Sequence, residues 1–354
     1  MSAAQGGAGG QRRRAPTVDV DGVVLLDKPE GLSSNAALQR ARRCFNASKA
    51  GHTGTLDPMA TGLLPVCFGD ATKFSQGLLD ADKAYVATAL LGVATDTGDR
   101  EGEFIARRPV EATAARVAAA LAALTGPLQQ VPPMYSALKH HGKPLYAIAR
   151  AGGEVERAPR QVVIHQLDLV EWDSPHLTFA VRCSKGTYVR TLAEQIAERL
   201  DTVAHLTALR RTAVGPFTLE TAVTLVALEA AEPAQRQRHL RPADTLVQAL
   251  PALALCDSDA LGLLQGRTLE RCEAAAAMMS ADAGAVVLVR LYGAPGLPGL
   301  RNAGAEPRVF LGMGAVEAGS DGAARVRPVR LIAHVAAPSA TENGALRSLP
   351  SETA

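Results

Sequence analysis

The chain has 354 residues, a length typical of two or three domains, with 47% hydrophobic and 20% charged residues. With 37 Lys and Arg against 35 Asp and Glu, the net charge of +2 excludes the strongly basic composition of chromatin proteins. No apolar run reaches about 18 residues, and the first residues lack the apolar core of a signal peptide. Five cysteines without a C-x-x-C pair argue against a zinc site or a disulfide framework. These features predict an intracellular, cytoplasmic protein with folded domains and no membrane span.

The amino terminus has little to bury. Residues 1–16 are mainly Gly, Ala and Gln with three consecutive arginines, a composition that predicts a disordered basic arm. Folded structure is expected to begin with a strand at Gly22–Leu26, which ends in a turn containing Pro and Gly. Ser33 or Ser34 can then cap a helix that runs to about Phe45.

A loop rich in Gly and Pro follows at residues 51–62 and leads into a buried strand at Leu63–Phe68. Hydrophobic alternation over Lys83–Leu91 predicts another strand, and the Ala-rich residues 111–124 are typical of an amphipathic helix. The first part of the chain is therefore expected to contain both strands and helices.

Residues 132–160 show little periodicity and carry seven potentially basic groups against two glutamates. Loops of this length inside a compact domain are usually functional. The basic residues of this segment are Lys139, His140, His141, Lys143, Arg150, Arg157 and Arg160. The segment is therefore a candidate functional insertion.

Strands are predicted again at Gln161–Glu171 and Leu177–Arg190. A capping box at Thr191–Glu194 is expected to start the helix that follows. Tyr188 and Arg190 would then share one face at the end of the second strand.

The composition changes after Arg238, where prolines and Gly-rich turns separate short hydrophobic segments. The expected strands lie around Ala285–Leu291, Arg308–Gly314 and Val326–Ile332. We therefore place a domain boundary near residue 245, between a main domain at 17–245 and a small β-rich domain at 246–335. Residues 336–354 are polar and are expected to be disordered.

Taken one at a time, the candidate functional residues leave the function open. Asp57 precedes a proline, as in many turns, and His52, Tyr85 and Arg190 each fit an ordinary structural role. The sequence has no Walker A loop, G-x-G-x-x-G or H-E-x-x-H motif, so nucleotide hydrolysis, dinucleotide redox chemistry and zincin chemistry lack support.

Four ordered segments together resemble one known family. They are residues 26–35 (LDKPEGLSSN), 51–66 (GHTGTLDPMATGLLPV), 83–87 with 95–99 (KAYVA and TDTGD), and 183–191 (CSKGTYVRT) with His205 and 209–211. In this order they resemble the first pseudouridine synthase motif, the nucleophile loop, the second-motif strand with its tyrosine, and the third motif of the TruB family, the bacterial tRNA pseudouridine-55 synthases. The resemblance spans residues 22–218.

This resemblance implies an α+β fold. Its core would be a pseudouridine synthase domain with a mixed, mainly antiparallel sheet flanked by helices, and residues 132–160 would be its RNA-clamping thumb insertion. The small C-terminal β-rich domain would be a PUA-like RNA-binding module. Within it, residues 273–283 and 293–306 match poorly and are candidate insertions.

The resemblance also implies an isomerase that converts uridine 55 of tRNA to pseudouridine without a cofactor or a metal. Asp57 would be the nucleophile, attacking either C6 of the base or C1′ of the ribose. Arg190 would pair with it in a bidentate manner and oppose the rise in pKa that burial causes. Tyr85 would stack on the base and serve in proton transfer, and Tyr188 and Leu209 would line the same pocket.

The implied partner is the T-arm of tRNA, whose target base must be flipped out of the stack. His52 would insert or stack in its place. Lys28 and the stretch around Arg40, Arg42 and Arg43 would hold phosphates together with the thumb. We expect a monomer without an obligatory protein partner.

Two alternatives stay open. One is a guide-RNA-dependent pseudouridine synthase of the box H/ACA type, which the loop at residues 51–54 and the long basic insertion disfavour. The other is a non-catalytic RNA-binding or tRNA-folding protein on the same scaffold. The intact set of Asp57, Tyr85 and Arg190 disfavours this second alternative, although binding and catalysis can coexist.

Overall fold

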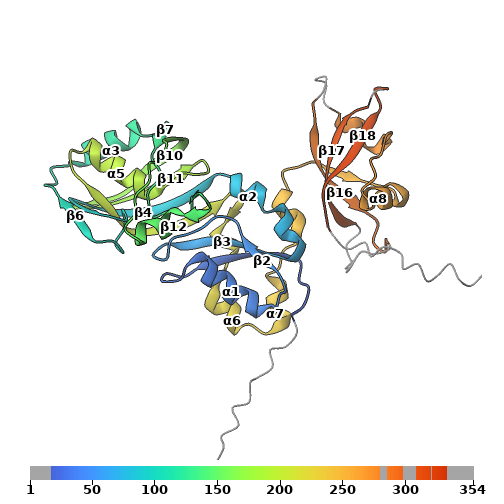
Figure 1. Ribbon diagram of the computed structural model, residues 1–354, viewed down its shortest axis with the longest axis horizontal. Coiled ribbons are helices and arrows are strands. Elements are labelled where there is room, and N and C mark those ends of the chain that lie inside the picture. Colours follow the sequence, from blue (N-terminus) through green and yellow to red (C-terminus); the bar gives the residue numbers. More distant parts are fainter. Residues whose placement is uncertain (1–16, 280–284, 298–307, 320, 333–354) are drawn as a thin grey trace, which may run out of the picture. The chain divides into compact units, whose positions relative to one another are not determined.

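The computed structural model describes residues 17–279, 285–297, 308–319 and 321–332 (Figure 1). The chain divides into two compact units between Pro242 and Ala243. The segments 1–16 and 336–354, expected to be disordered, lie outside the described residues. In the described ranges no helix is long and apolar enough to cross a membrane.

The first unit is built on a ten-stranded sheet whose main path runs β14-β1-β3-β12-β4-β11-β10-β7, with β13 beside β12 and β2 beside β3. Two pairs, β1 with β14 and β12 with β3, are parallel, and the other described pairs are antiparallel. The strands are β1 (Gly22–Lys28), β2 (Ala50–His52), β3 (Thr61–Phe68), β4 (Lys83–Leu91), β7 (Gly126–Gln130), β10 (Arg160–Asp173), β11 (His176–Cys183), β12 (Ala204–Val214), β13 (Phe217–Thr218) and β14 (Val223–Thr224). The expected mixed, mainly antiparallel sheet is confirmed.

Helices flank this sheet and short hairpins extend from it. The helix α3 packs against β10, α5 against β12, and α1 against both β3 and α6. The helices are α1 (Ser34–Cys44), α2 (Gln76–Asp80), α3 (Ala114–Ala123), α4 (Leu145–Arg150), α5 (Val189–Arg199), α6 (Leu225–Ala230) and α7 (Pro233–Arg238). Short 3₁₀ turns lie at Gly69–Phe74 and Leu219–Thr221. The hairpins are β5 (Val93–Thr95) with β6 (Phe104–Arg107), and β8 (Lys139–His140) with β9 (Lys143–Pro144).

Local sequence explains how the first elements begin and end. The first five residues of β1, beginning with Gly22, are all buried. An unbroken buried run is expected for a strand that is covered on both faces. The side chain of Ser33 accepts a hydrogen bond from the Ala36 N–H, so Ser33 is the N-cap of α1, one of the two caps that the sequence allowed. Arg42 and Arg43 in the last turn suit the negative end of the helix dipole.

The third motif folds differently from the expectation. The strand β11 ends at Cys183, and α5 begins at Val189, so Arg190 lies in the first turn of a helix and not on a strand. The expected capping box at Thr191–Glu194 is also wrong, because Tyr188 occupies the N-cap position without a side-chain cap. A turn containing Gly186, whose φ is +79°, separates the strand from the helix.

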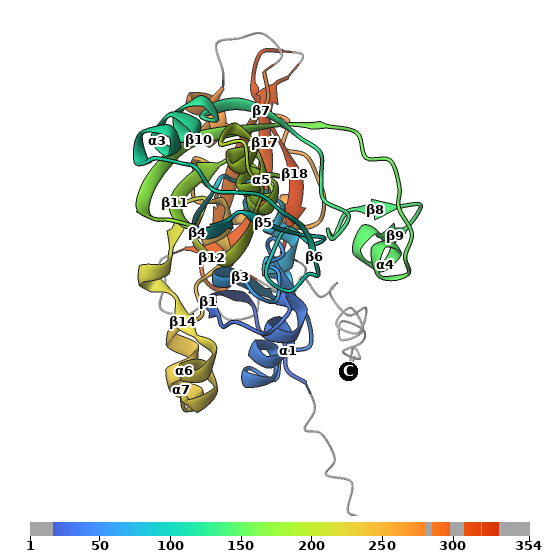
Figure 2. The same cartoon turned by 90° about the vertical axis from the view of Figure 1, so that its left-hand side faces the viewer.

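The thumb segment forms a small substructure of its own. The hairpin β8–β9 and the helix α4 project away from the sheet between β7 and β10 (Figure 2). At its base, Arg157 donates a hydrogen bond to the Pro132 carbonyl over 3.1 Å and forms an ion pair with Glu154. Leu145 is buried at the start of α4, so the segment has a small packing contact despite its weak periodicity.

The second unit is β-rich. Its four-stranded sheet runs β15-β16-β17-β18, with β15 parallel to β16 and the other pairs antiparallel. Its elements are β15 (Ala252–Ala254), α8 (Asp257–Leu264), β16 (Val287–Gly293), β17 (Val309–Ala318), β18 (Ala324–Leu331) and 3₁₀ turns at Ala243–Val247 and Glu273–Met278. Ala275 is fully buried in this unit's core. The described part of the Ala-rich segment therefore packs against this unit, and its interpretation as an insertion stays a prediction.

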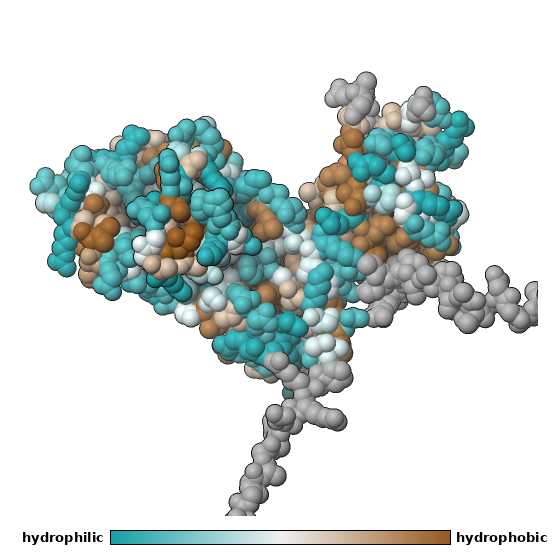
Figure 3. All heavy atoms as spheres, viewed as in Figure 1, coloured by the Kyte–Doolittle hydropathy of each residue, from teal (hydrophilic) through white to brown (hydrophobic). Residues whose placement is uncertain are grey.

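Hydrophilic residues cover most of the face seen in Figure 3, where the hydrophobic ones form separate patches. Large hydrophobic side chains that are more than half exposed include Phe104 and Ile105 on β6 and Val226 on α6. Scattered exposure of this kind is ordinary for protein surfaces.

Candidate active site

Asp57 lies in the loop that joins β2 to β3, and β3 is an interior strand of the large sheet, between β1 and β12. Its carbonyl accepts a hydrogen bond from the Ala60 N–H, which closes a turn around Pro58. At the end of this loop, Gly62 has φ of +103°, and a Cβ there would lie 2.3 Å from the Arg211 carbonyl oxygen. Gly62 is therefore required for the close approach of the loop to β12.

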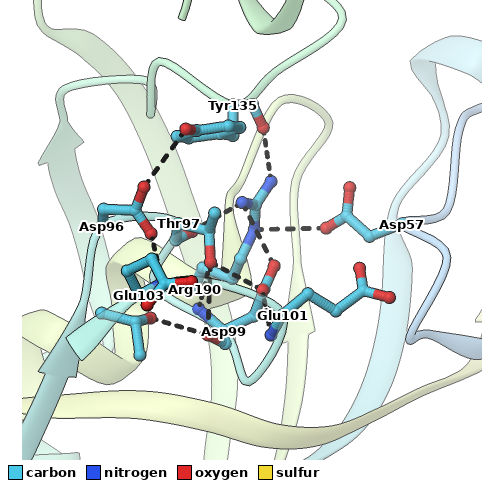
Figure 4. Close-up of polar contacts among 9 residues, drawn as sticks. Asp57, Asp96, Thr97, Asp99, Glu101, Glu103, Tyr135 and Arg190 are labelled. Carbon is cyan, nitrogen blue, oxygen red and sulfur yellow. Dashed lines mark hydrogen bonds and ion pairs between the residues drawn. The ribbon is translucent and has the colours of Figure 1, made fainter. Parts of the chain in front are cut away.

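The Asp57 carboxylate contacts Arg190, as Figure 4 shows. Arg190 Nε lies 3.2 Å from Asp57 Oδ2, and the arginine side chain is 6% exposed. The other two guanidinium nitrogens donate to the carbonyl oxygens of Thr97 and Tyr135, each over 2.7 Å. The expected bidentate pairing is wrong, because Arg190 contacts Asp57 through Nε. Its Nη1 and Nη2 atoms instead bind the backbone at Thr97 and Tyr135.

Two opposing effects act on the ionisation of Asp57. Burial raises the pKa of its carboxyl, Arg190 and Lys28 lower it, and the negative charge of Asp99 raises it again. The net direction is a raised pKa, so the expected arginine effect is present but weaker than burial. About a third of the Asp57 side chain is exposed, which leaves it open to a ligand.

Asp99 is a member of this site that the sequence reasoning missed. It is buried, and its Oδ2 lies 3.4 Å from Arg190 Nη1. Its Oδ1 accepts hydrogen bonds from the Thr97 hydroxyl and the Glu101 N–H, which fixes the carboxylate. Asp99 belongs to the TDTGD segment that resembles the second motif. The sequence therefore marked this segment but did not indicate that Asp99 pairs with Arg190.

Asp96 lies in the same β5–β6 loop as Asp99 and connects this loop to the start of the thumb. Its Oδ2 accepts a hydrogen bond from the Tyr135 hydroxyl over 3.2 Å, and its Oδ1 accepts one from the Glu103 N–H (Figure 4). Because the Tyr135 carbonyl accepts from Arg190, this tyrosine contacts the loop through its side chain and Arg190 through its backbone.

Gln130 compensates for the missing cap of α5. Its Oε1 accepts a hydrogen bond from the Tyr188 N–H over 2.9 Å, and its Nε2 donates to the Tyr188 carbonyl over 3.3 Å. Gln130 is buried and also donates to Gln195 Oε1. The side-chain amide thus holds Tyr188, and with it the helix turn that carries Arg190. No sequence signal pointed to this residue.

Tyr85 and Leu209 lie on adjacent central strands. Tyr85 on β4 is paired with Arg211 on β12, and Ala87 is paired with Leu209. Because alternate strand residues point to the same face, Tyr85, Leu209 and Arg211 share one side of the sheet. Leu209 is buried, and burial raises the pKa of the Tyr85 hydroxyl and of the Tyr188 hydroxyl. Of the predicted pocket residues, Tyr85 and Leu209 therefore lie on one face of the sheet, and Tyr188 lies at the N-terminus of α5.

His52 is the last residue of β2, five positions before Asp57. Burial and the nearby charge of Arg211 lower its pKa, so the neutral imidazole is favoured. In the described part of the chain its buried Nδ1 has no hydrogen-bond partner. An uncharged ring of this kind can stack on a base.

The predicted phosphate contact of Lys28 is wrong. This side chain is fully buried, and its Nζ donates to the carbonyl oxygens of Pro29, Leu32 and Pro58. Burial lowers its pKa to about 8, although the Asp57 charge acts in the opposite direction. Its ammonium group is therefore committed to the backbone around the Asp57 loop and cannot reach a phosphate.

Two of the expected phosphate contacts on α1, those of Arg40 and Arg42, are also not supported, whereas that of the exposed Arg43 stays a prediction. Arg40 forms a two-bond pair with Glu229 on α6, with distances of 2.7 and 2.5 Å. Arg42 donates to the carbonyl oxygens of Ala47 and Ser48. These two arginines hold the α1 region together and have little capacity left for RNA.

The cations of the thumb have the opposite character. Lys139, Lys143 and Arg150 are exposed, and no carboxylate of the described chain lies within 4.0 Å of their charged nitrogens. Arg150 stacks over the Tyr146 ring at 5.8 Å. The described ranges also contain no group of three or more His, Cys, Asp or Glu side chains arranged to hold a metal ion.

Comparison with known proteins agrees with this architecture. Cbf5 in a crystal structure of a Cbf5–Nop10–Gar1 complex superposes with a TM-score of 0.62 at 24% identity, covering 88% of this chain and 84% of that one. Cbf5 in the archaeal box H/ACA Nop10–Cbf5 complex gives 0.60 at 22% identity, covering 88% and 86%. The chain therefore shares the fold of Cbf5.

The sequence comparisons are more specific. Residues 42–189 match the TruB family pseudouridylate synthase N-terminal domain, and residues 190–248 match the tRNA pseudouridylate synthase B C-terminal domain. The tRNA pseudouridine synthase B of Aromatoleum aromaticum is 55% identical over 317 residues, which cover 90% of this chain and 94% of the relative. That of Burkholderia lata is 56% identical over 293 residues, covering 83% and 90%. The chain belongs to the TruB family of pseudouridylate synthases.

Proposed function

We propose that this protein isomerises the uridine at position 55 of tRNA, in the T-loop, to pseudouridine. One observation carries the proposal. The Asp57 carboxylate is paired with the buried Arg190 guanidinium in a TruB-family chain, and relatives 55–56% identical to it are named tRNA pseudouridine synthase B. The enzyme is then an isomerase that moves the uracil ring within its own nucleotide.

The reaction breaks the N1–C1′ bond of uridine and forms a C5–C1′ bond. The proton on C5 leaves and N1 gains one, so the atoms and electrons balance without an oxidant or a reductant. Asp57 acts as the nucleophile at C1′ or at C6, which splits one hard substitution into two easier steps. Arg190 and Lys28 favour the ionised carboxylate that this step needs, against the effect of burial.

The neighbouring residues receive the flipped nucleotide. Tyr85 stacks on the base and serves in proton transfer, while Leu209 and Tyr188 line the same pocket. His52 takes the place of the base in the T-loop stack. Its lowered pKa supports this role, because a neutral ring loses less hydration when it stacks between bases. Stacking recovers part of the few kcal/mol that flipping costs.

The thumb at residues 132–160 and the β-rich domain at 246–335 bind the RNA around the site. The exposed cations Lys139, Lys143 and Arg150 support the thumb's part, because phosphate contacts need cations free of protein partners. The second unit would act as a PUA-like domain that binds RNA without touching the reacting uridine. Within it, Arg325 and Arg327 are paired with Glu317, whereas Arg267 and Arg330 are exposed.

The protein works alone, as a cytoplasmic monomer. The chain aligns with 94% of the Aromatoleum aromaticum relative, whose name, tRNA pseudouridine synthase B, mentions no partner protein. The solved Cbf5 structures are complexes with other proteins, and their identity to this chain of 22–24% supports a common fold and no more.

Incubating an unmodified tRNA transcript with the protein alone and mapping its pseudouridines tests this proposal. We expect one pseudouridine, at position 55, and none in a transcript that carries cytidine there. Modification that requires an added guide RNA or partner proteins would favour the guide-dependent alternative. Tight tRNA binding without any modification would leave the RNA-folding alternative and overturn the proposal.

A further inference from the structure

Arg211 is the largest fully buried side chain in the described part of the molecule. It lies on β12, is 1% exposed, and has no Asp or Glu oxygen within 4.0 Å among the described residues. A buried charge without a counter-ion is costly unless other groups compensate it closely. The contacts that Arg211 makes therefore indicate what it does.

Two of these contacts hold the loop that carries Asp57. Arg211 Nε donates to the Leu63 carbonyl over 2.7 Å, and Nη2 donates to the Gly54 carbonyl over 3.2 Å. Leu63 follows the loop and Gly54 precedes Asp57 by three residues, so one guanidinium ties both ends of the loop. The backbone of Arg211 also packs directly against Gly62.

A third contact involves Tyr85, the cross-strand partner of Arg211 in the sheet. Cross-strand partners lie side by side on one face of a sheet. The positive charge of Arg211 opposes the rise in the pKa of the Tyr85 hydroxyl that burial causes.

We propose that Arg211 is a positioning residue that holds the Asp57 loop in one fixed arrangement beside Tyr85 for the isomerisation. This inference rests on the proposed function, because the arrangement matters only if Asp57 and Tyr85 face the same reacting base. Arg211 is buried beneath the site and contacts no RNA. Its loss therefore lowers the rate of the chemical step and leaves tRNA affinity nearly unchanged.

Replacing Arg211 tests this directly. In Arg211→Met we expect the single-turnover rate at saturating tRNA to fall about 100-fold, the effect that a small misplacement of reacting groups can have. The tRNA dissociation constant should stay within about threefold, since no RNA contact is removed. Hydrogen exchange of peptides covering residues 53–62 should become faster in the same variant, because both carbonyl anchors are lost.

Lys83→Met is the matched control. Lys83 is also buried on β4, two residues before Tyr85, and its Nζ donates to the carbonyl oxygens of Leu78, Leu79 and Ala81. It therefore reports the general effect of losing a buried cation from this sheet. We expect lowered thermal stability in both variants but slow turnover and a faster-exchanging 53–62 loop in Arg211→Met alone.

Arg211→Lys keeps the charge but has one nitrogen in place of three. Its saturated rate should therefore lie above that of Arg211→Met and clearly below that of wild type. If Arg211→Met fails to fold, Arg211→Lys provides the same test. Unchanged exchange at residues 53–62, or a saturated rate for both Arg211 variants no lower than that of Lys83→Met, would overturn the inference. Hydrogen exchange can be measured even in protein that has no activity. It therefore tests the role of Arg211 independently of whether the wild-type protein forms pseudouridine.

Discussion

The cations of the candidate active site and those of the thumb are of the same chemical kind but in opposite surroundings. Arg190, Arg211 and Lys28 are buried, and each is committed to named carbonyl or carboxylate oxygens. Lys139 and Lys143 are exposed and have no such partner in the described structure. The first group fixes geometry, whereas the second can exchange its counterions for phosphates.

This difference explains why charge alone is a poor guide to RNA binding in this chain. A buried cation changes the pKa and the position of its neighbours, so its loss should slow the chemical step. An exposed cation changes association with a polyanion, so its loss should weaken affinity and salt dependence. Variants that separate rate from affinity can therefore test whether the two groups of cations differ in this way.

The largest effect among the supporting residues is expected for Arg190→Lys. Arg190 contacts Asp57, Asp99 and two carbonyl oxygens through three nitrogens, and a single ammonium group cannot reach all of them. We expect the saturated single-turnover rate to fall about 100-fold, or ~2.7 kcal/mol in the barrier, with tRNA affinity within about threefold. A lysine variant as fast as wild type would show that the positive charge alone suffices.

A smaller loss is expected for Asp99→Asn. Asparagine keeps an oxygen for the Thr97 hydroxyl and the Glu101 N–H but loses the charge that faces Arg190. We expect about a tenfold slower saturated rate (~1.4 kcal/mol). Asp96→Asn is the matched control on the same loop, since Asp96 has no contact with Arg190 in the described structure. Equal losses in the two variants would argue against a specific role for Asp99.

The rate should also depend on pH through Asp57. Because its pKa is raised, the carboxyl becomes protonated at a higher pH than the ordinary value of about 3.9. We therefore expect the saturated single-turnover rate to fall with acid along a limb whose apparent pKa lies above that value. Measurements between about pH 4 and 8, in protein that stays folded, check this. A rate that is flat down to the ordinary value would contradict the raised pKa.

The smallest effect on rate is expected in the thumb. Replacing Lys139, Lys143 and Arg150 together by Gln should leave the saturated rate within about threefold but reduce the slope of log K against log salt by about two to three. Arg116→Gln is a control for loss of an exposed cation that already has a carboxylate partner, Asp201. An unchanged slope in the triple variant would place the RNA clamp on another surface.

Local patterns predicted several elements well. The strand at β1, the strand at Lys83–Leu91 and the Ser33-capped helix each follow from signals within about ten residues. The Asp57–Arg190 pair was predicted only through the family resemblance, because 133 positions separate the two residues and no local pattern connects them.

The failures share a physical cause. From its position at the end of a strand, Lys28 was predicted to be an exposed charge. In the structure its Nζ is surrounded by carbonyl oxygens, and one of them belongs to Pro58, 30 residues away. Gln130 supplies the cap of a helix that starts 59 positions later. Contacts between segments far apart in the chain decide such roles, and composition or spacing does not report them.

Asp57 is the proposed nucleophile, and its replacement by Asn is the most direct test of the proposed function. With unmodified tRNA at saturation, wild-type protein should form pseudouridine at position 55, and Asp57→Asn should form none while binding tRNA about as tightly. The variant should unfold at no lower temperature, because a carboxyl with a raised pKa lowers the free energy of unfolding once it ionises. Turnover by the folded variant within about tenfold of wild type (~1.4 kcal/mol) would contradict the central claim.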